Sequence, residues 1–427
     1  MSNPIFIARQ DTLEQEILPA HWLSQYKLFG EESYTFQDKE IWKKLCMSRA
    51  AANDRDMHAD ALEEMLTTFS AEHTGKWMLL IYGLDAAALD GLATMATIAA
   101  YGTAMAAVAG NALLMHAIAN SETAMQAISR SQTAMQRIAN STTAMDAISG
   151  SKIARGAVQA SPYYNSYITE NDMAIAKLVV SFANLASAGY SGMAGVAADA
   201  TAMNAVAASS TAMNAVAASS VARNAISASP YYDAKIKEND MAIAKLVVGF
   251  ANLESARYSG CAGMAADSTA MTAVAASSTA MTAVAASGVA LKAIAQAYKK
   301  TANMLQFLKA VNASDTLVKR IYSTLTNATA LFGAAQLGAQ DGVADANSWA
   351  TTSAAPNAFL ACACGYYNSG GASVDVTYNG TVIAQNKTGT RQPGSVTSTN
   401  VNAITMAPST FTENGDGWLA VQKFTAK

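Results

Sequence analysis

A ten-residue repeat in the middle of the chain limits the possible folds more than any other feature of the sequence. The tripeptide Thr-Ala-Met recurs at intervals of ten residues, and each unit reads approximately Ser-x-Thr-Ala-Met-x-Ala-Val/Ile-Ala-x. Examples of the tripeptide begin at Thr123, Thr133, Thr143, Thr201, Thr211, Thr269 and Thr279. In one unbroken α-helix, successive units would face directions that differ by about 80°. Supercoiling accommodates periods near 3.5 or 3.67 residues per turn, so a single long coiled coil is not expected.

One short helix per repeat agrees with the same pattern. The serine that opens each unit is a good N-cap, because its hydroxyl accepts from backbone N–H groups two or three residues later. Met and the Val or Ile three residues after it lie on one face of about two helical turns, as a core rather than a soft-metal site. Helices this short are unstable alone and must stack on one another. The sequence therefore predicts a mainly α repeat region, either a short-helix solenoid or an Ala-rich shaft of longer helices.

A second period of 68 residues is superimposed on the first. The tetrapeptide Ser-Pro-Tyr-Tyr begins at Ser161 and again at Ser229, and an eleven-residue segment from Glu170 recurs unchanged from Glu238. Ser can cap a helix and Pro suits its first position, so each tetrapeptide predicts a longer helix. We expect these helices to run to about residues 185 and 253, before Tyr-Ser-Gly segments. The repeated Glu-Asn-Asp could ligate calcium, but helix-surface charge is the simpler interpretation.

Composition divides the chain into three predicted domains. Residues 1–75 contain both charged and aromatic residues, which predicts a globular domain that serves as an anchor. Residues 76–345 form the helical repeat region, in which ten-residue repeats lie within 68-residue modules. Residues 350–427 are rich in Gly, Asn, Thr and Val, which predicts a small all-β C-terminal domain.

Strand patterns are clearest in the last eighty residues. Residues 374–378 alternate apolar and polar, Asn379-Gly380 supplies a two-residue turn, and residues 381–384 return as the second strand of a hairpin. Further strands are expected at residues 401–406 and 418–424. This pattern predicts a small antiparallel sandwich or jelly-roll-like tip.

Four aromatic residues of the β region are candidates for contact with a ligand or receptor. Aromatic side chains in a Gly- and Asn-rich tip can stack on sugars or form recognition hot spots, and they can equally form the core of a small β domain. The candidates are Tyr366, Tyr367, Tyr378 and Trp418.

No catalytic motif is present, and no residue is predicted to bind a metal or a cofactor. The histidines are scattered, and His58 with its neighbouring aspartates is interpreted as a solvated helix face. Cys362 and Cys364 do not match a standard zinc spacing, so buried free thiols in a strand are expected, with a redox or metal role as the alternative. The net charge of −3 without a basic block argues against nucleic-acid binding. The absence of a signal peptide or long apolar run predicts synthesis in a cytoplasm without membrane insertion.

The repeats resemble those of tailed-bacteriophage tail-fibre and other virion structural proteins. Residues 209–218, Ser-Ser-Thr-Ala-Met-Asn-Ala-Val-Ala-Ala, show the pattern that carries this resemblance, which covers most of residues 100–160 and 200–296. The order of globular N-terminus, repetitive shaft and β-rich C-terminus is also similar to that of phage fibres. The matching motif is architectural, so no catalytic or receptor-binding residue is carried over.

The resemblance implies a non-enzymatic virion protein of the tail-fibre or adhesin type. Other virion proteins would bind residues 1–75, the β tip would contact a host surface receptor or glycan, and the protein would be a homo-oligomer. The alternatives are a collar, whisker or capsid-decoration protein and, in a different class, a bacterial surface adhesin.

Overall fold

The computed structural model describes residues 95–427, except residues 101, 111, 298–303, 341–347, 352–356, 367–371, 390–394, 408 and 416. The predicted N-terminal anchor, residues 1–75, lies outside the described residues. The chain divides into two compact units, Met1–Val196 and Ala197–Lys427.

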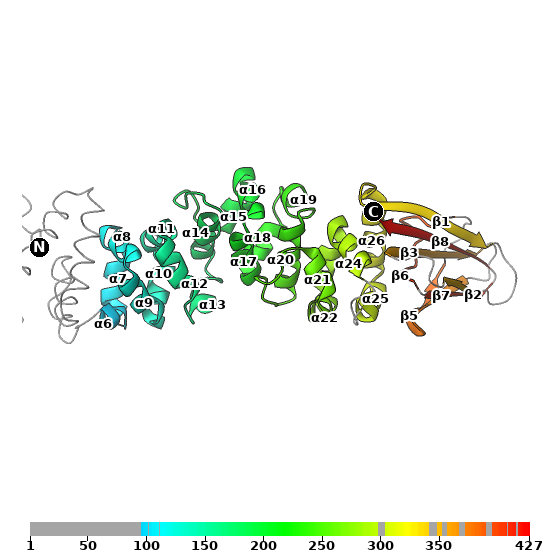
Figure 1. Ribbon diagram of the computed structural model, residues 1–427, viewed down its shortest axis with the longest axis horizontal. Coiled ribbons are helices and arrows are strands. Elements are labelled where there is room, and N and C mark those ends of the chain that lie inside the picture. The colour runs from blue at the N-terminus through cyan, green and yellow to red at the C-terminus, as the bar shows by residue number, and fades with distance from the viewer. Residues whose placement is uncertain are drawn as a thin grey trace, which may run out of the picture. The chain divides into compact units, whose positions relative to one another are not determined.

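The described part of the first unit consists of short helices (Figure 1). They are α6 (Met95–Ala100), α7 (Gly102–Gly110), α8 (Ala112–Asn120), α9 (Glu122–Ser129), α10 (Gln132–Ala139), α11 (Thr142–Gly150), α12 (Lys152–Gln159), α13 (Tyr164–Tyr167) and α14 (Asp172–Phe182). A further helix, α15 (Met193–Ala198), begins in this unit. The prediction of one short helix per ten-residue repeat is confirmed for this part of the chain.

Three serine caps of the first unit, Ser131, Ser141 and Ser151, each make two kinds of hydrogen bond. The Ser151 side chain accepts a hydrogen bond from the Ala154 N–H at 3.3 Å, which caps α12. Its hydroxyl also donates to the Ala119 carbonyl, 32 residues earlier, at 2.5 Å. The same 32-residue link is made by Ser131, Ser141 and Ser161. These bonds agree with the packing of the helices, because each of α6 to α11 contacts the third helix after it.

The core of the first unit is the predicted apolar stripe. In the repeats, Met and the Ile or Val three residues later are almost fully buried, as Met125 and Ile128 illustrate with 0% exposure. The Ala before each Met is buried as well, which lets the backbones approach closely. The interpretation of the methionines as core residues is confirmed for the described repeats.

The long helices expected after the Ser-Pro pairs are interrupted. In the first copy, the one-turn helix α13 ends at Tyr167, the four residues 168–171 follow, and α14 then begins at Asp172. Asn171 caps α14 by accepting from Ala174 N at 3.0 Å, so a new helix starts there. The helix ends at Phe182, because Asn184 takes a left-handed backbone conformation with a φ of 59°. The prediction of one continuous helix to residue 185 is therefore wrong, and the second copy repeats the break.

The second unit contains the later repeats and two further helices. Its helices are α16 (Ala200–Ala208), α17 (Ser210–Ala218), α18 (Ser220–Ser227), α19 (Tyr232–Lys235), α20 (Asp240–Phe250), α21 (Cys261–Ala266), α22 (Ser268–Ala276), α23 (Ser278–Ala286), α24 (Gly288–Ala297), α25 (Met304–Asn312) and α26 (Asp315–Asn327). Contacts with the third helix along the chain continue through α22–α25 and α23–α26. The longest described helix, α26, has 13 residues. The last two helices thus keep the packing of the repeats without their sequence.

The β domain is a two-sheet sandwich at the C-terminal end of the second unit (Figure 1). Its strands are β1 (Phe332–Gln340), β2 (Ser348–Thr351), β3 (Ala358–Tyr366), β4 (Ala372–Tyr378), β5 (Thr381–Thr388), β6 (Ala403–Met406), β7 (Ser409–Gly415) and β8 (Gly417–Ala426). The sheet orders are β1-β8-β3-β6 and β2-β7-β4-β5, and all these neighbours are antiparallel. The chain changes sheet at every connection except the β4–β5 hairpin, which is the strand order of a jelly roll.

The strand predictions hold, but the predicted boundary does not. Tyr378 pairs with Thr381 across the Asn379-Gly380 turn, whose φ angles are 48° and 76°. Strands β6 and β8 lie where strands were expected. However, strand β1 begins at Phe332, inside the region assigned to helix. Small and polar residues of β1 gave no strand signal, and its pairing with β8 supplies the missing stabilisation.

Helices α20 to α26 and the β domain of the second unit share one hydrophobic core. Strand β6 is at a sheet edge. The buried Asn312 of α25 forms hydrogen bonds with backbone groups on the unpaired side of this strand. The Asn312 amide donates to the Ile404 carbonyl at 2.7 Å and accepts from the Ile404 N–H at 3.0 Å. The Tyr322 hydroxyl of α26 lies 2.6 Å from the Val396 carbonyl. The two Asn312 bonds occupy backbone groups of an edge strand that would otherwise be open to another strand.

Candidate functional site

The three predicted aromatic residues that the structure describes, Tyr366, Tyr378 and Trp418, do not form one exposed surface. Tyr378 and Trp418 are buried in the β domain with exposures of 5% and 2%. Tyr366 ends strand β3 and is partly exposed, and Tyr367 lies outside the described residues. Two of the four candidates are therefore core residues, which corrects the prediction of ligand contact for Tyr378 and Trp418.

Trp418 is buried because a glycine faces it. Gly365 and Trp418 are direct partners across strands β3 and β8. A Cβ atom at Gly365 would collide with the indole ring, so the ring occupies the space that the glycine leaves. The indole N–H has no hydrogen-bond partner among the described residues. The aromatic ring therefore contributes core packing at this position.

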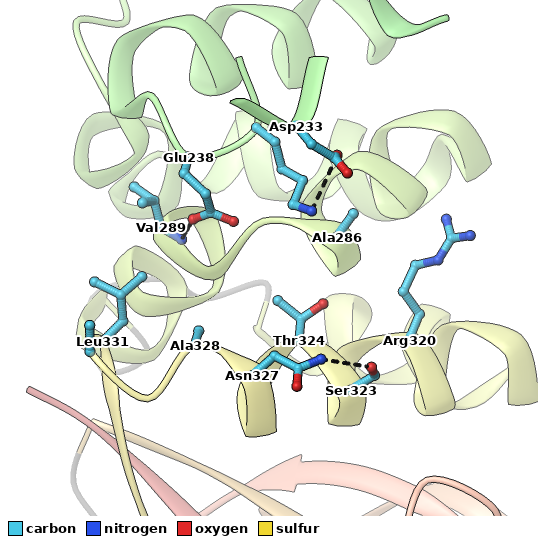
Figure 2. Close-up of a pocket in the computed structure, with 12 residues that line it drawn as sticks. Asp233, Glu238, Ala286, Val289, Arg320, Ser323, Thr324, Asn327, Ala328 and Leu331 are labelled. Atoms are coloured by element: carbon cyan, nitrogen blue, oxygen red, sulfur yellow. Dashed lines mark hydrogen bonds and ion pairs between the residues drawn. The ribbon is translucent and has the colours of Figure 1, made fainter. Parts of the chain in front are cut away.

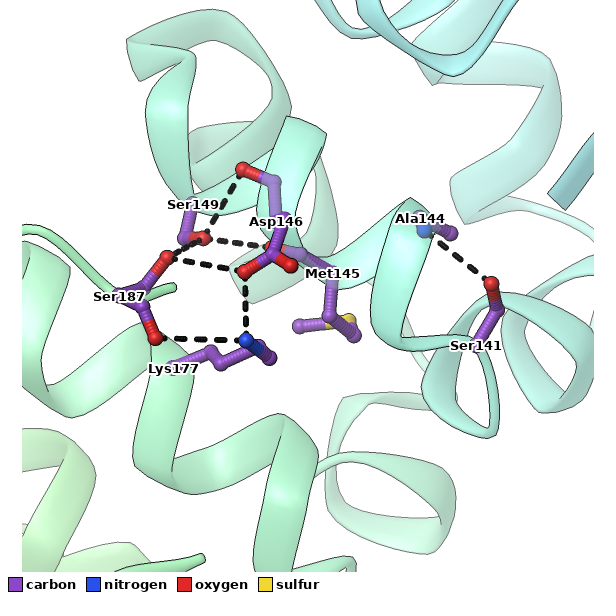
Figure 3. Close-up of polar contacts among 7 residues, drawn as sticks. All are labelled: Ser141, Ala144, Met145, Asp146, Ser149, Lys177 and Ser187. Atoms are coloured by element: carbon purple, nitrogen blue, oxygen red, sulfur yellow. Dashed lines mark hydrogen bonds and ion pairs between the residues drawn. The ribbon is translucent and has the colours of Figure 1, made fainter. Parts of the chain in front are cut away.

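A buried lysine is the centre of the main polar cluster of the first unit (Figure 3). Lys177 of α14 has an exposure of 1%, and its Nζ lies 2.5 Å from Oδ1 of Asp146 on α11. The ammonium group also donates to the Ser187 carbonyl at 3.3 Å. The Ser187 and Ser149 hydroxyls are 2.6 Å apart, and Ser149 also donates to the Met145 carbonyl at 2.5 Å. The cluster ties α14, the loop after it and α11 together.

This cluster contains the residue types of a nucleophilic site without the required geometry. A lysine can activate a serine when its amine accepts the hydroxyl proton. Here Lys177 donates to a carboxylate and a carbonyl, and its contact with Ser187 is to the backbone oxygen. The Ser149 hydroxyl is held by a backbone carbonyl of its own helix. The arrangement fastens a loop and does not activate a nucleophile.

The second unit repeats the cluster with different partners. Lys245 of α20, 68 residues after Lys177, is fully buried and donates to Asn214 Oδ1 at 2.7 Å and to the Ser255 carbonyl at 3.0 Å. Asn214 replaces Asp146, and Ala217 replaces Ser149. Burial lowers the pKa of Lys245. The loop attachment is kept in both copies, whereas the carboxylate and one hydroxyl are not, which favours a structural role for the lysine.

The cysteine prediction is confirmed for the thiols that the structure describes. Cys362 and Cys364 are buried free thiols in strand β3, and Cys261 is a buried free thiol in α21. Burial raises the pKa of the Cys362 thiol. Cys46 and His58 lie outside the described residues. Within the described part of the chain, no group of three or more His, Cys, Asp or Glu side chains could hold a metal ion.

A groove of the second unit lies between α26 and the start of α24 (Figure 2). Its volume is about 990 Å³, and alanine, valine and leucine side chains form part of its lining. Glu238 accepts hydrogen bonds from the Gly288 and Val289 N–H groups at 3.0 and 3.1 Å. Lys237 pairs with Asp233 at 3.2 Å. These charged side chains are therefore engaged by the protein itself.

Sequence reasoning missed the two lysines and the capping role of Asp172 and Asp240. Each lysine is a single charge inside an otherwise apolar stretch, Ala-Ile-Ala-Lys-Leu-Val-Val, and this repeated interruption was the available signal. Asp172 accepts from the Met193 N–H at 2.8 Å, and Asp240 accepts from the Cys261 N–H at 3.0 Å. The repeated Glu-Asn-Asp segment thus caps helices, in addition to placing charge on the surface.

Among the described residues, no single helix is long and apolar enough to cross a membrane; the bent pair α22 and α23 meets the length and composition test only when taken together. No family model and no curated protein matches this chain.

Proposed function

We propose that this protein is a structural component of a tailed-phage virion, in which a helical solenoid carries a β tip. It is a tail-fibre or adhesin-type protein without enzymatic activity. Residues 1–75 attach to other virion proteins, and the β domain contacts a host surface or a partner. The protein works as a homo-oligomer on the outside of the particle.

The observation that carries the proposal is the repetition of one packing interaction. Short helices contact the third helix along the chain, and four serines of the first unit bond to carbonyls 32 residues earlier. This arrangement suits a solenoid with three helices per turn, whose length grows with the number of repeats. Its interior consists of Ala, Met, Ile and Val, so its polar groups serve as caps and links. Such a region is suited to be a spacer.

The strand order of the β domain supports a second candidate. Jelly rolls are common in viral capsid domains as well as in lectins. A collar, whisker or capsid-decoration protein would use the β domain as its docking end. A bacterial surface adhesin is the third candidate, and it would place the protein on cells rather than on particles.

Immunogold electron microscopy of the phage particles distinguishes these candidates. Separate antibodies are raised against residues 1–75 and residues 332–427, so that the second covers the whole β domain. Label from the β-domain antibody at distal tail tips is the expected result. Label at the neck or head would support the collar or decoration protein, and unlabelled particles would overturn the virion assignment.

Duplication of residues 121–150 tests the solenoid by itself. These 30 residues are three repeats, which is one turn of the proposed solenoid. The enlarged protein should keep its unfolding midpoint and become longer in small-angle X-ray scattering. A protein that widens without lengthening, or that loses its cooperative unfolding, would contradict the solenoid.

A further inference from the structure

A second groove, in the β domain, has walls of a different chemistry. It has a volume of about 420 Å³ and lies between the start of α26, strand β5 and residues 399–402. Except for Val401, all of its lining residues have polar side chains: amides, hydroxyls, two lysines and one carboxylate. A volume of this size suits one or two sugar residues. We call this site the polar groove.

A β-bulge directs neighbouring side chains into the polar groove. Val374 pairs with Lys387 and Val376 pairs with Ala384, so β5 has one residue more than β4 between these pairs. In a regular strand, successive side chains point to opposite faces. Here Gln385 and Asn386 both line the groove, and Asn386 has a left-handed φ of 51°. Bulges frequently re-aim side chains beside functional sites.

The protein holds the walls of the polar groove in place. The Asn386 N–H donates to Asp375 Oδ1 at 2.6 Å, which fixes the bulge. The Asn402 amide donates to the Thr388 carbonyl at 2.8 Å and accepts from the Cys364 N–H at 2.7 Å. Lys387 pairs with Asp315 at 2.7 Å and joins strand β5 to α26. A ligand would therefore meet polar groups that are already ordered.

The charges of the polar groove favour an acidic ligand. Lys387 is paired with Asp315, and this contact holds the pKa of the Asp315 carboxyl below its usual range. Lys319 also lowers the pKa of Asp315, but two lysines face a single carboxylate in the lining, so the polar groove carries a net positive charge. A carboxylate accepts charge-assisted hydrogen bonds from lysine, and amide side chains can both donate to and accept from hydroxyl groups.

We propose that the polar groove binds a hexuronic acid residue of a glycan. The sugar carboxylate lies at Lys319, and its hydroxyls bond to the amides of Gln385 and Asn386. The inference rests on the proposed function in that it names the class of surface ligand that the β tip contacts.

The test is a titration of the full-length protein with glucuronic acid, in which saturation-transfer NMR measures binding. Binding with a dissociation constant on the order of millimolar is expected, with glucose and acetate each binding more weakly. Lys319→Gln should weaken glucuronic acid binding about tenfold, because one charge-assisted contact is lost. Lys309→Gln on α25 is the matched control, since it removes the same charge from an exposed side chain outside the groove and should leave binding unchanged.

Several outcomes would overturn the inference. They are absence of glucuronic acid binding, equal binding of acetate, and an unchanged affinity in Lys319→Gln. The titration uses purified protein, whereas the virion assignment is tested by labelled particles. A failed titration therefore leaves the position of the protein on the particle to be decided separately.

Discussion

The two copies of the 68-residue module keep the same lysine and surround it differently. In the first unit, Lys177 meets the Asp146 carboxylate, whose side chain is 37% exposed, and two serine hydroxyls lie beside it. In the second unit, the fully buried Lys245 meets a neutral amide. Because the sequence around the lysines is identical, the comparison separates what the loop attachment needs from what its partners add. A donor that reaches the loop carbonyl is present in both copies, whereas the carboxylate is present in one.

The largest expected difference between the two copies concerns how closely α20 packs against α17. A Cβ atom at Gly249 of α20 would lie 2.6 Å from the Ala217 carbonyl oxygen and 2.8 Å from its Cα, so the backbone would have to shift. The first copy has serine at the same place, Ser181. We expect Gly249→Ser to lower the stability of the second unit by about 3 kcal/mol, at the upper end of overpacking costs. The reverse change, Ser181→Gly, should cost about 0.5 kcal/mol through helix propensity.

Hydrogen-exchange mass spectrometry measures both changes separately in each unit. Peptides of α17 and α20 should lose protection in Gly249→Ser, and peptides of the first unit should not. Unchanged protection of α17 would show that the helices can move apart without cost.

The caps of the two units offer the next comparison. Ser151 both caps α12 and donates to the Ala119 carbonyl, whereas Asp199 caps α16 with a carboxylate that cannot donate. We expect Ser151→Ala to lower the stability of the first unit by about 2 kcal/mol. The helix cap and the hydrogen bond to the Ala119 carbonyl should each contribute about half of this loss. Ser151→Asp keeps a capping acceptor and places it against a carbonyl oxygen, so its cost should be at least as large.

Asp199→Ser is the matched control, because it exchanges the same two residue types at a cap. Its effect on stability should be a few tenths of a kcal/mol, given the similar preference of both residues for this position. Thermal unfolding followed by circular dichroism gives the ranking. If Ser151→Asp left the unfolding midpoint unchanged, only the capping bond of Ser151 would contribute to stability.

The lysines themselves should differ when each is replaced by methionine. Lys177→Met leaves the Asp146 carboxylate without its partner, and we expect a loss of about 2 kcal/mol, reduced from the cost of a fully buried pair because Asp146 is partly exposed. Lys245→Met removes a buried charge that faces a neutral amide, so a loss below about 1 kcal/mol is expected. Proteolysis of the loops at residues 184–192 and 252–260 reports the effect. Equal losses in the two units would refute a distinct role for the carboxylate.

The repeats could be predicted from the sequence because their information is local. A serine cap and a Met with an Ile or Val three residues later specify one short helix, and the structure contains that helix wherever the described chain has the pattern. The β4–β5 hairpin is equally local, since Asn379-Gly380 favours its turn. Strand β1 was missed because its pairing with β8 joins residues far apart in the chain.

The roles of the candidate site residues were harder to predict from the sequence than the repeats were. Trp418 looked like a ligand-contacting residue until its partner across the sheet, Gly365, was known. The role of Lys177 depends on Asp146, 31 residues earlier, and that contact exists only after the helices have packed. Side chains that meet through tertiary packing leave little trace in a local pattern.

Converting one cluster into the other tests the comparison most directly. Asn214→Asp gives Lys245 the carboxylate that Lys177 has and should stabilise the second unit by about 1 kcal/mol at pH 7. Asp146→Asn should cost the first unit a similar amount. The gain from the new carboxylate requires its charged form, so it should be present above the carboxyl's unfolded pKa of about 4 and disappear as the pH falls below it.

The unchanged protein has a second pH dependence, which the same substitution should reduce. Burial lowers the pKa of Lys245 in the folded state, so the unfolded chain binds this proton more tightly. The stability of the second unit should therefore rise as the pH increases from the lowered pKa toward the ordinary value of 10.5. Asn214→Asp favours the ammonium form in the folded protein and should flatten this rise. Urea unfolding between pH 7 and 10 measures the slope, and an equally steep slope in both proteins would show that the added carboxylate does not reach the lysine.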